Sequence, residues 1–310
     1  MFRISYLTVS VAAVVAISSH GGSALAVEKM PVFQRTVETG VKDPVSLSVA
    51  VAAGNVDISY SRDDQIAVYA FGKGATGENL PEDYFKTNLI IEQKDGVVSI
   101  RDSRLDVPSL LGSLSSVTYR IEVPYRTKVE STISGTGNQT LIGVFGPATL
   151  ITGVGDIDAR YVRFATLHAS TGKGNINCIR DFQVDAQTDA GNITLMEDGD
   201  SKAVVKAGHG RIEVGGARGS VDASTQAGPL RIKALLSGDW QLKSDSGSIV
   251  VQLPPQAKFD IEASSDSGEI IANRDDMQTS EAEIHHLQKQ VNGGGKHIVA
   301  RSVKGSISIE

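Results

Sequence analysis

Three aspartates stand at the same place in a repeated turn, two residues before a glycine, and carboxylates at such a place could perform acid–base chemistry. Asp245 and Asp266 fall on repeats that follow one another in the sequence, so we expect their carboxylates to meet, whereas Asp189 lies earlier in the chain. Clustered aspartates serve β-helix enzymes that cleave acidic polysaccharides. No histidine or basic partner recurs beside these residues, however, and paired carboxylates alone do not define a catalytic site.

Further oxygen-bearing side chains come directly after the glycine of successive turns. On neighbouring strands about 4.8 Å apart, such oxygens could bind calcium. Asn and Asp also suit turns for a simpler reason, since their side chains hydrogen-bond nearby backbone groups. The calcium-binding pattern G-G-x-G-x-D is absent, so the sequence favours the turn role and predicts no metal. The four residues are Asn138, Asp156, Asn175 and Asn192.

Histidines gather in the last part of the chain. His285, His286 and His297 surround a segment that also holds Glu281 and Glu283, and imidazole together with carboxylate is a common set of metal ligands. The spacing fits no zinc pattern, and a solvated loop accounts for the same residues. We therefore predict no metal or cofactor site.

Two further residues have both a chemical and a packing interpretation. Trp240 could stack against a sugar, but it falls at an apolar position of the repeat, which favours the core. Cys178 falls at another such position and is interpreted as a small buried hydrophobe. The chain has no G-x-S-x-G motif, and the GKG at residues 172–174 belongs to a repeat turn and not to a phosphate loop. No catalytic residue is predicted.

These candidates are positioned by a repeat of one glycine-containing turn. Successive marker glycines are 17 to 21 residues apart, and only the last spacing, of 37 residues, differs. If that spacing spans two turns, the period averages about 18.7 residues, which is the self-similarity expected of a solenoid. The marker glycines are Gly137, Gly155, Gly174, Gly191, Gly210, Gly228, Gly247, Gly268 and Gly305.

Four apolar columns accompany the marker glycine, at seven and five residues before it and at two and four residues after it. Ile193 and Ile249 share one column, while Thr194 and Ser248 take outward positions. Offsets of two are the period of a strand with one buried face, so each rung has two strands joined by a glycine turn. The chain is predicted to be all-β, a single parallel β-solenoid with rungs of about 18–19 residues.

The hand of the solenoid follows from the way parallel strands connect. We expect a right-handed β-helix or roll, because parallel crossovers are nearly always right-handed. A left-handed helix of hexapeptide repeats is the alternative, and it would also fit a rung of 18 residues. The apolar columns do not recur every six residues, which favours the first interpretation.

The first 26 residues have the pattern of a cleaved secretory signal. An apolar run from Leu7 to Ile17 follows Arg3, and residues 24–26 (ALA) form a small–x–small cleavage site. This run is too short to span a membrane, and no later run approaches the roughly 20 apolar residues that spanning requires. We therefore expect a mature chain that begins at Val27 and is exported to the periplasm, cell surface or exterior, with no integral membrane segment.

Charge and cysteine content narrow the possible partners. The formal net charge is −6, and removal of the signal with Arg3 would make the mature chain more acidic. This balance argues against nucleic acid as a partner, which a basic surface normally accompanies. The single cysteine excludes an internal disulfide framework, so the fold must be held by its own core, which a chain of this length can form.

The rest of the chain is arranged around the repeat. Residues 27–44 are expected to be a linker or lead-in, and residues 45–310 one solenoid domain. Turns at Gly54 and Gly96 are expected to mark two early rungs, and Gln139 breaks an otherwise apolar column. Three inserts interrupt the domain, of which the last is expected to carry a short helix. The inserts are expected at 72–84, 102–116 and 276–295.

Several motifs recur together: the start GNVDI, rungs of the form G-x-G-x-I-x-V, the segments IEVPYRTKVESTISGTGN and VQLPPQAKFDIEASSDSGEI, and the ending VNGGGKHIVARSVKGSISI. Over roughly residues 45–310 these motifs resemble the bacterial putative adhesin family, a group of exported repeat domains whose biochemical role is mostly unassigned. The resemblance implies a β-solenoid fold. Its motifs contain no catalytic residues that could be carried over to this chain.

Together these observations predict a non-enzymatic, exported, adhesin-like surface or envelope scaffold that binds an envelope protein or a glycan. The alternative is a polysaccharide lyase or hydrolase built on a β-helix, which would need charged residues gathered on one outer sheet and long loops that form a cleft. The outward positions instead mix Thr, Asn, Asp, Glu, Arg and Ser. The oligomeric state is left open.

Overall fold

A computed structural model describes residues 33–38, 45–74, 76–106, 114–180, 183–197, 202–277 and 284–310. The expected signal peptide, residues 1–26, lies outside the described residues, as does most of the expected lead-in. Contacts group Pro31–Glu310 into one compact unit. Within the described residues, this unit contains two sheets of 13 strands each, which confirms the predicted all-β fold.

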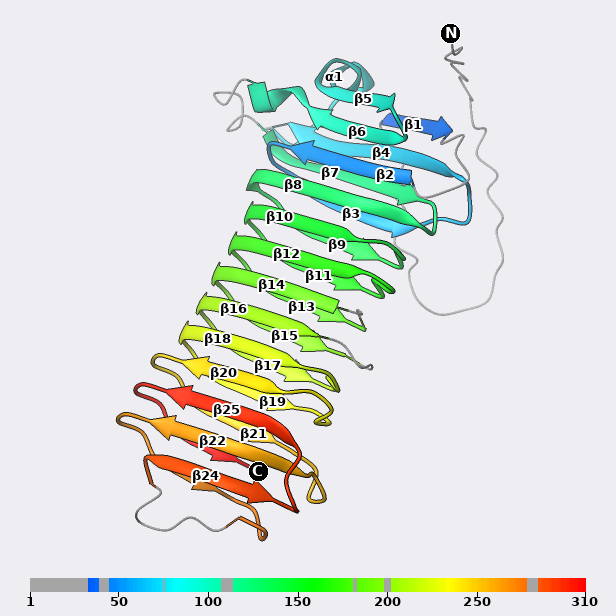
Figure 1. Ribbon diagram of the computed structural model, residues 1–310. Helices are drawn as coiled ribbons and strands as arrows, with labels where there is room; N and C mark the ends of the chain where they lie inside the picture. Colours follow the sequence, from blue (N-terminus) through cyan, green and yellow to red (C-terminus); the bar gives the residue numbers. More distant parts are fainter. Residues whose placement is uncertain are drawn as a thin grey trace, which may run out of the picture. The chain divides into compact units, whose positions relative to one another are not determined.

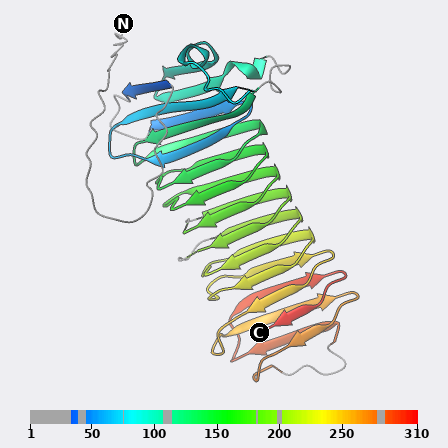
Figure 2. The ribbon, with the colours of Figure 1, turned by 180° about the vertical axis from the view of Figure 1, so that it is seen from behind.

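The two sheets lie face to face, and most neighbouring strands within each sheet are parallel (Figures 1 and 2). In spatial order, sheet A contains β1 (Phe33–Glu38), β4 (Gln65–Gly74), β7 (Leu114–Val123), β3 (Asn55–Tyr60), β9 (Gln139–Ile142), β11 (Ile157–Arg160), β13 (Ile176–Ile179), β15 (Ile193–Met196), β17 (Ile212–Gly215), β19 (Leu230–Lys233), β21 (Ile249–Gln252), β26 (Ile307–Ile309) and β23 (Ile270–Ala272). In the same direction, sheet B contains β5 (Leu89–Lys94), β6 (Val97–Asp102), β2 (Val45–Val51), β8 (Thr127–Thr136), β10 (Ala148–Val154), β12 (Thr166–Lys173), β14 (Gln183–Ala190), β16 (Ala203–His209), β18 (Val221–Ala227), β20 (Trp240–Ser244), β25 (Lys296–Ser302), β22 (Phe259–Ser265) and β24 (His286–Val291).

From β8 to β21 every rung is built in the same way, from a sheet B strand, a glycine turn and a sheet A strand. Each strand pairs in parallel with its counterpart in the next rung, as Leu150 does with Ala169 and Ile157 with Ile176. The predicted parallel solenoid is therefore confirmed. The glycine turns lie along one edge, on the left in Figure 1, and we call it the glycine edge. The connections from sheet A to the following sheet B strand lie along the other edge, which we call the loop edge.

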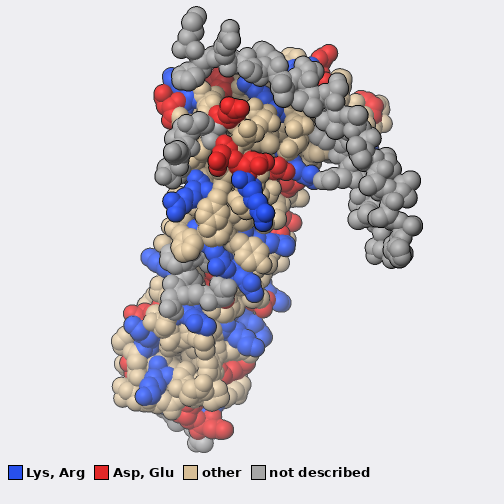
Figure 3. Space-filling model, turned by 90° about the vertical axis from the view of Figure 1, so that its right-hand side faces the viewer, with Lys and Arg blue, Asp and Glu red and all other residues tan. Residues whose placement is uncertain are grey.

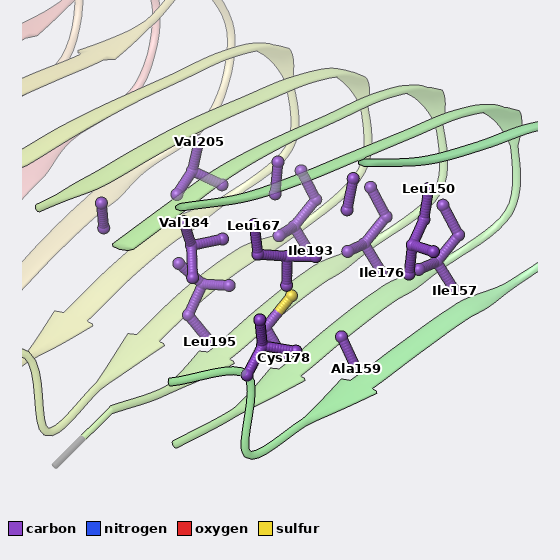
Figure 4. Close-up of a cluster of buried hydrophobic side chains, with 14 of the residues drawn as sticks. Leu150, Ile157, Ala159, Leu167, Ile176, Cys178, Val184, Ile193, Leu195 and Val205 are labelled. Atoms are coloured by element: carbon purple, nitrogen blue, oxygen red, sulfur yellow. The ribbon is translucent and has the colours of Figure 1, made fainter. Parts of the chain in front are cut away.

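The side chains of the four predicted apolar columns point into the space between the sheets, as Figure 4 shows for several rungs. Ile157 and Ile176 come from sheet A, and Leu150 and Leu167 face them from sheet B. Every residue of these columns is buried except Ala272, which is partly buried. Complete burial of such a side chain contributes about 1.5–3 kcal/mol, so each rung adds its own share of core.

A fifth inward column, three residues before the marker glycine, carries hydroxyl groups. The Oγ1 of Thr171 donates to the carbonyl oxygen of Gly155 in the neighbouring rung at 2.9 Å, and Thr188 donates to Gly174 at 3.0 Å. These bonds satisfy hydroxyls that would otherwise be buried without a partner. The same bond is made by Thr152 to Gly137, Thr225 to Gly210, Ser302 to Gly247 and Ser265 to Gly305.

The marker glycine is required by the space around it and, at five of the nine positions, also by its backbone conformation. Gly174 has a φ of 153°, which L side chains rarely adopt, and a Cβ atom there would overlap the carbonyl oxygen of Gly155. The rungs are stacked so closely at the glycine edge that only a hydrogen atom fits between them.

The N-terminal end does not follow the order of the sequence. The rung formed by β2 and β3, with Gly54 at its turn, lies between β6 and β7 on one side and the rung of β8 and β9 on the other. Beyond it, antiparallel strands end the stack, since β5 pairs with β6 and β4 pairs with both β7 and β1. The expected rung at Gly96 is wrong. Asp95 and Gly96, at φ values of 52° and 78°, form the tight turn of the β5–β6 hairpin within one sheet.

The two inserts expected at this end are partly regular. In the first, β4 continues to Gly74 and helix α1 (Glu82–Asn88) follows, with Phe85 buried against the core. In the second, the 3-10 helix η1 (Ser103–Asp106) precedes β7. Residues 33–38 of the expected lead-in form β1, which is the edge strand of sheet A.

The C-terminal end is also out of sequence order. β25 and β26 lie between the rung of β20 and β21 and the rung of β22 and β23. Gly305 therefore stacks on Gly247, and Gly268 stacks on Gly305. The expectation that the 37-residue spacing spans two stacked turns is wrong, because the chain first forms β24 and then inserts its last rung one place inward.

The short helix expected within 276–295 is also wrong for the described part of that insert. Residues His286–Val291 form β24, which pairs antiparallel with β22 at the edge of sheet B. The physical reason is the open edge of β22, whose backbone N–H and carbonyl groups need partners. A strand can satisfy these groups, whereas a helix cannot.

Candidate functional site

The two aspartates singled out by the sequence do not meet. Asp245 follows β20 and Asp266 follows β22, and β25 lies between these strands. Two strand spacings amount to about 9.6 Å, and Asp245 instead lies 3.6 Å from the Nζ atom of Lys243. Asp189, on β14, belongs to a rung further along the stack. The expected carboxylate pair is thus wrong, because the strand order at this end differs from the sequence order.

The polar residues that follow the marker glycines hold neighbouring rungs together. The Oδ1 of Asn138 accepts a hydrogen bond from the backbone N–H of Asp156 at 2.8 Å, and the Oδ1 of Asp156 accepts one from Asn175 at 2.7 Å. Asn175 accepts from Asn192, and Asn192 accepts from Arg211, both at 2.9 Å. These oxygens therefore form a hydrogen-bonded ladder along the glycine edge. They bond the next rung, whereas the sequence suggested bonds within each turn.

The histidines are separated by the strands around β22. His286 lies on β24 and His297 on β25, and these two strands pair with opposite sides of β22. The Nδ1 of His285 lies 2.8 Å from the carbonyl oxygen of Gly268, and the Nδ1 of His297 lies 4.0 Å from Asp260. Among the residues that the structure describes, no three His, Cys, Asp or Glu side chains are grouped to hold a metal ion. Glu281 and Glu283 lie outside the described residues.

Trp240, Cys178 and Gln139 all lie in the core. Trp240 is completely buried, and its Nε1–H donates to the carbonyl oxygen of Gly219 at 3.2 Å, so its ring cannot serve as a sugar platform. Cys178 is buried in its apolar column. Gln139 is buried as well, and its Nε2 donates to the carbonyl oxygen of Ile151 at 2.6 Å.

A buried charged cluster at the N-terminal end was not foreseen from the sequence. Arg104, in η1, forms a salt bridge with Asp102, with Nε lying 2.7 Å from Oδ2, and its Nη2 donates to the carbonyl oxygen of Ala53 at 3.1 Å. The hydroxyl of Tyr119 donates to Asp102 at 3.0 Å. Burial, reinforced by the charge of Asp102, raises the pKa of Tyr119, so the phenol stays protonated. All these side chains are buried, and the cluster therefore fastens η1 and β7 to the Ala53 turn.

Exposed aromatic side chains form a row along the loop edge. The ring centroids of Tyr60 and Tyr125 are 5.7 Å apart, those of Tyr125 and Phe145 are 4.2 Å apart, and those of Phe145 and Phe164 are 5.7 Å apart. We call these four residues the aromatic row. Phe164 is 78% exposed and Tyr125 is 43% exposed. Phe145 and Phe164 both stand ten residues before a marker glycine, an offset that the four apolar columns do not include, whereas Tyr60 and Tyr125 lie before the regular rungs begin.

Charged side chains accompany the row. Figure 3 faces the loop edge and shows Lys and Arg recurring along it, with Asp and Glu gathered toward the N-terminal end. Arg126, Arg163 and Arg180 lie in the connections nearest the row, and the guanidinium carbon of Arg180 lies 5.9 Å from the ring centroid of Tyr161. The acidic end includes a shallow hollow, lined by Glu38, Asp63, Asp64 and Gln65.

The stacked rungs match a known family. A family model described as Toastrack DUF4097 matches residues 45–310, which is most of the chain and every rung from β2 onward. The chain belongs to the Toastrack DUF4097 family. This match confirms the resemblance to a family of repeat proteins that the sequence motifs indicated.

The solved structures that are similar to this Toastrack chain are distant from it in sequence. They include a putative lipid binding protein from Parabacteroides distasonis, with 13% identity and a TM-score of 0.48. A putative adhesin from Bacteroides fragilis has 13% identity and a TM-score of 0.44, and a putative cell adhesion protein from Clostridium sporogenes has 14% and 0.26. Each comparison covers 89% of this chain and 96% of the other. Comparison with curated proteins gave no match.

A shallow hollow on sheet A is lined in part by Asn192, Arg211 and Glu213. None of the helices in the described part of the chain has the length and apolar character needed to span a membrane.

Proposed function

We propose that this Toastrack chain is a non-enzymatic, exported surface or envelope scaffold that binds an envelope protein or a glycan. The observation that carries the proposal is the role of the recurring polar side chains. At the glycine edge the Asn and Asp oxygens and the Thr hydroxyls bond the neighbouring rung, so the most regular polar groups serve the stack itself. Binding is then left to the outer sheet faces and the loop edge.

Two further observations support binding without turnover. Asp245 and Asp266 are separated by β25, so their carboxylates are not adjacent, and Asp245 forms an ion pair with Lys243. The cluster of Asp102, Arg104 and Tyr119 has perturbed ionisation but is closed to solvent, so no substrate reaches it. Export is supported by the sequence of the first 26 residues, with its apolar run and its small–x–small site.

A panel of acidic and neutral polysaccharides, incubated with the chain beginning at Val27 in the presence and absence of calcium, tests this function. We expect co-sedimentation with a member of the panel and no release of new chain ends. Release of product that disappears in an Asp245→Asn, Asp266→Asn double variant would establish a lyase or hydrolase instead. Asp222→Asn, which removes another exposed carboxylate from sheet B, is the matched control.

A further inference from the structure

Two aromatic residues at the loop edge adopt a backbone conformation that bulky side chains avoid. Tyr161 and Phe164 both have a φ of 61°, in the left-handed region. By strand register, the place of Tyr161 is taken by Gly143 in one neighbouring rung and by Arg180 in the other, at φ values of 73° and 58°, so this left-handed turn recurs and only the glycine adopts it without strain. Packing does not explain why Phe164 has a left-handed backbone, because Phe164 is the most exposed large hydrophobic side chain in the described residues. Backbone strain kept without a gain in packing is typical of functional sites.

The strained segment ends the aromatic row. Phe164 lies against Phe145 with the ring planes 32° apart, and Phe145 stacks on Tyr125 with the planes 24° apart. Tyr60 closes the other end, edge-on to Tyr125. Because these rings come from neighbouring rungs, the row runs along the direction in which the rungs stack. A ligand that covers it must be extended in that direction.

The charged side chains beside the aromatic row indicate which kind of extended ligand it binds. Arg126 and Arg163 lie in connections that carry the row, and Arg180 lies in the next connection along the stack, where it is placed over the ring of Tyr161. A guanidinium offers a planar pair of donors that matches a carboxylate. Beyond Tyr60 the chain continues into an acidic hollow lined by Asp63 and Asp64. An anionic chain is therefore favoured at the Phe164 end and repelled beyond Tyr60.

We propose that the aromatic row is the binding platform for a linear polysaccharide that carries carboxylate groups, such as a polymer of uronic acids. The C–H groups on the apolar face of a sugar ring are slightly positive and stack on the negative face of an aromatic ring. The sugar carboxylates meet the arginines beside the row. This inference rests on the proposed binding function and names its site and its ligand class.

A glycan fits the row better than the other occupants of an exposed aromatic surface. A protein partner would need about 800 Å² on each side with aromatic anchors seated in pockets. The rings here follow one another in a single file, edge-on, stacked and tilted in turn, with arginines beside them. Self-association and attachment to lipid remain as distinct outcomes of the experiment.

The test compares a Tyr125→Ala, Phe164→Ala double variant with the unchanged chain for binding to polygalacturonate, alginate and neutral dextran, by isothermal titration calorimetry. Burial of two aromatic side chains against a ligand predicts that their removal weakens uronate binding by about tenfold to a hundredfold or more. Leu235→Ala is the control, since Leu235 is 49% exposed in another connection of the loop edge and should leave binding unchanged. Arg180→Gln should weaken uronate binding and reduce its salt dependence. Thermal melting checks that each variant is folded.

The outcomes separate this inference from the proposed function. Uronate binding that is equal in the double variant overturns the platform but leaves the binding function standing, whereas product release overturns the function itself. Tighter binding of dextran than of the uronates overturns the ligand class. The inference also fails if the double substitution converts a dimer to a monomer in sedimentation, or if the unchanged chain binds phosphatidylglycerol vesicles and not polysaccharide.

Discussion

The backbone N–H and carbonyl groups of the strands find their hydrogen-bond partners in different ways in the middle rungs and at the two ends of the stack. From β8 to β21 the order of strands in space is the order in the sequence, and each rung offers its neighbours the same pairing. At the ends, the rungs of β2–β3 and of β25–β26 are inserted one place inward, so each is paired on both sides. A repeat can propagate but cannot end itself, because its last strand would present an open edge.

Three of the four edge positions of the two sheets are taken by strands that break the parallel pattern. β1, β5 and β24 pair antiparallel with their neighbours, whereas the fourth edge strand, β23, pairs in parallel with β26. β24 reads HLQKQV, in which exposed polar residues alternate with the buried Leu287 and Val291, and Lys289 shares the face of these two. Charged and polar side chains on an edge discourage pairing with another chain. The ends therefore stop the stack, whereas the middle only lengthens it.

The largest expected loss of stability comes from a substitution at the junction between the middle rungs and the C-terminal end. Ile249 is completely buried on β21, which pairs with the regular rung on one side and the inserted β26 on the other. Ile249→Asp should lower the free energy of unfolding by at least about 3–5 kcal/mol, because it buries an unpaired carboxylate. Urea unfolding measures the loss. Thr194→Asp, at an outward position, should change stability by only about 0.5 kcal/mol, and equal losses would contradict the assigned register.

Replacement of glycine by alanine should destabilise the protein more at a glycine turn of the middle rungs than at the hairpin turn of the N-terminal end. Gly174→Ala places a Cβ against the carbonyl of Gly155 and strains the backbone, which predicts a loss of about 2–4 kcal/mol. Gly96→Ala meets open space, so only its left-handed backbone is strained, at about 1 kcal/mol. Thermal melts of the two variants give the comparison. Similar losses would mean that the close stacking at the glycine edge is incorrect.

The inserted C-terminal rung should be as stable as a middle rung although it ends the chain. Ile307 is completely buried on β26, which is paired on both sides. Ile307→Ala should therefore cost about 2–4 kcal/mol, as should Ile193→Ala in the middle. In hydrogen exchange of the unchanged chain, β26 amides should be protected like those of β15 and more than those of the edge strand β23. A β26 that exchanges first, as chain ends usually do, would contradict the inserted position.

The middle could be predicted from the sequence because its rules are local. The number of residues between a position and its marker glycine determines which face of the strand the side chain is on, and that face determines whether it is buried. Ile157 and Ile176, each two residues after a marker glycine, are both buried. The hydroxyl column of Thr152, Thr171 and Thr188 obeys the same rule and could have been detected in the same way.

The ends could not be predicted in this way, because insertion is decided by which strand edge is open in space. The sequence places Asp245 and Asp266 on consecutive repeats, and nothing local shows that residues 296–309 come between them. The hairpin at Asp95–Gly96 is an exception, since this dipeptide is itself a strong turn signal. The candidate site could be predicted only in part, because Phe145 and Phe164 share an offset from the marker glycine but Tyr60 and Tyr125 lie outside the regular rungs.

The smallest expected effect on stability comes from the buried charged cluster at the N-terminal end. Tyr119 donates to Asp102 at 3.0 Å, and burial raises its pKa above the ordinary value of 10.0. In the unfolded chain the phenol loses its proton near pH 10, whereas in the folded chain it keeps the proton. Its contribution to stability is therefore complete below about pH 10 and is lost as the pH rises toward the folded pKa.

Tyr119→Phe should lower the free energy of unfolding by about 1 kcal/mol at neutral pH through the lost hydrogen bond. It should also make the fall in that free energy at alkaline pH shallower. Urea unfolding at neutral pH and above about pH 10 measures both effects, with the exposed Tyr60→Phe as control. An alkaline slope unchanged by Tyr119→Phe would show that the phenol is not buried against Asp102.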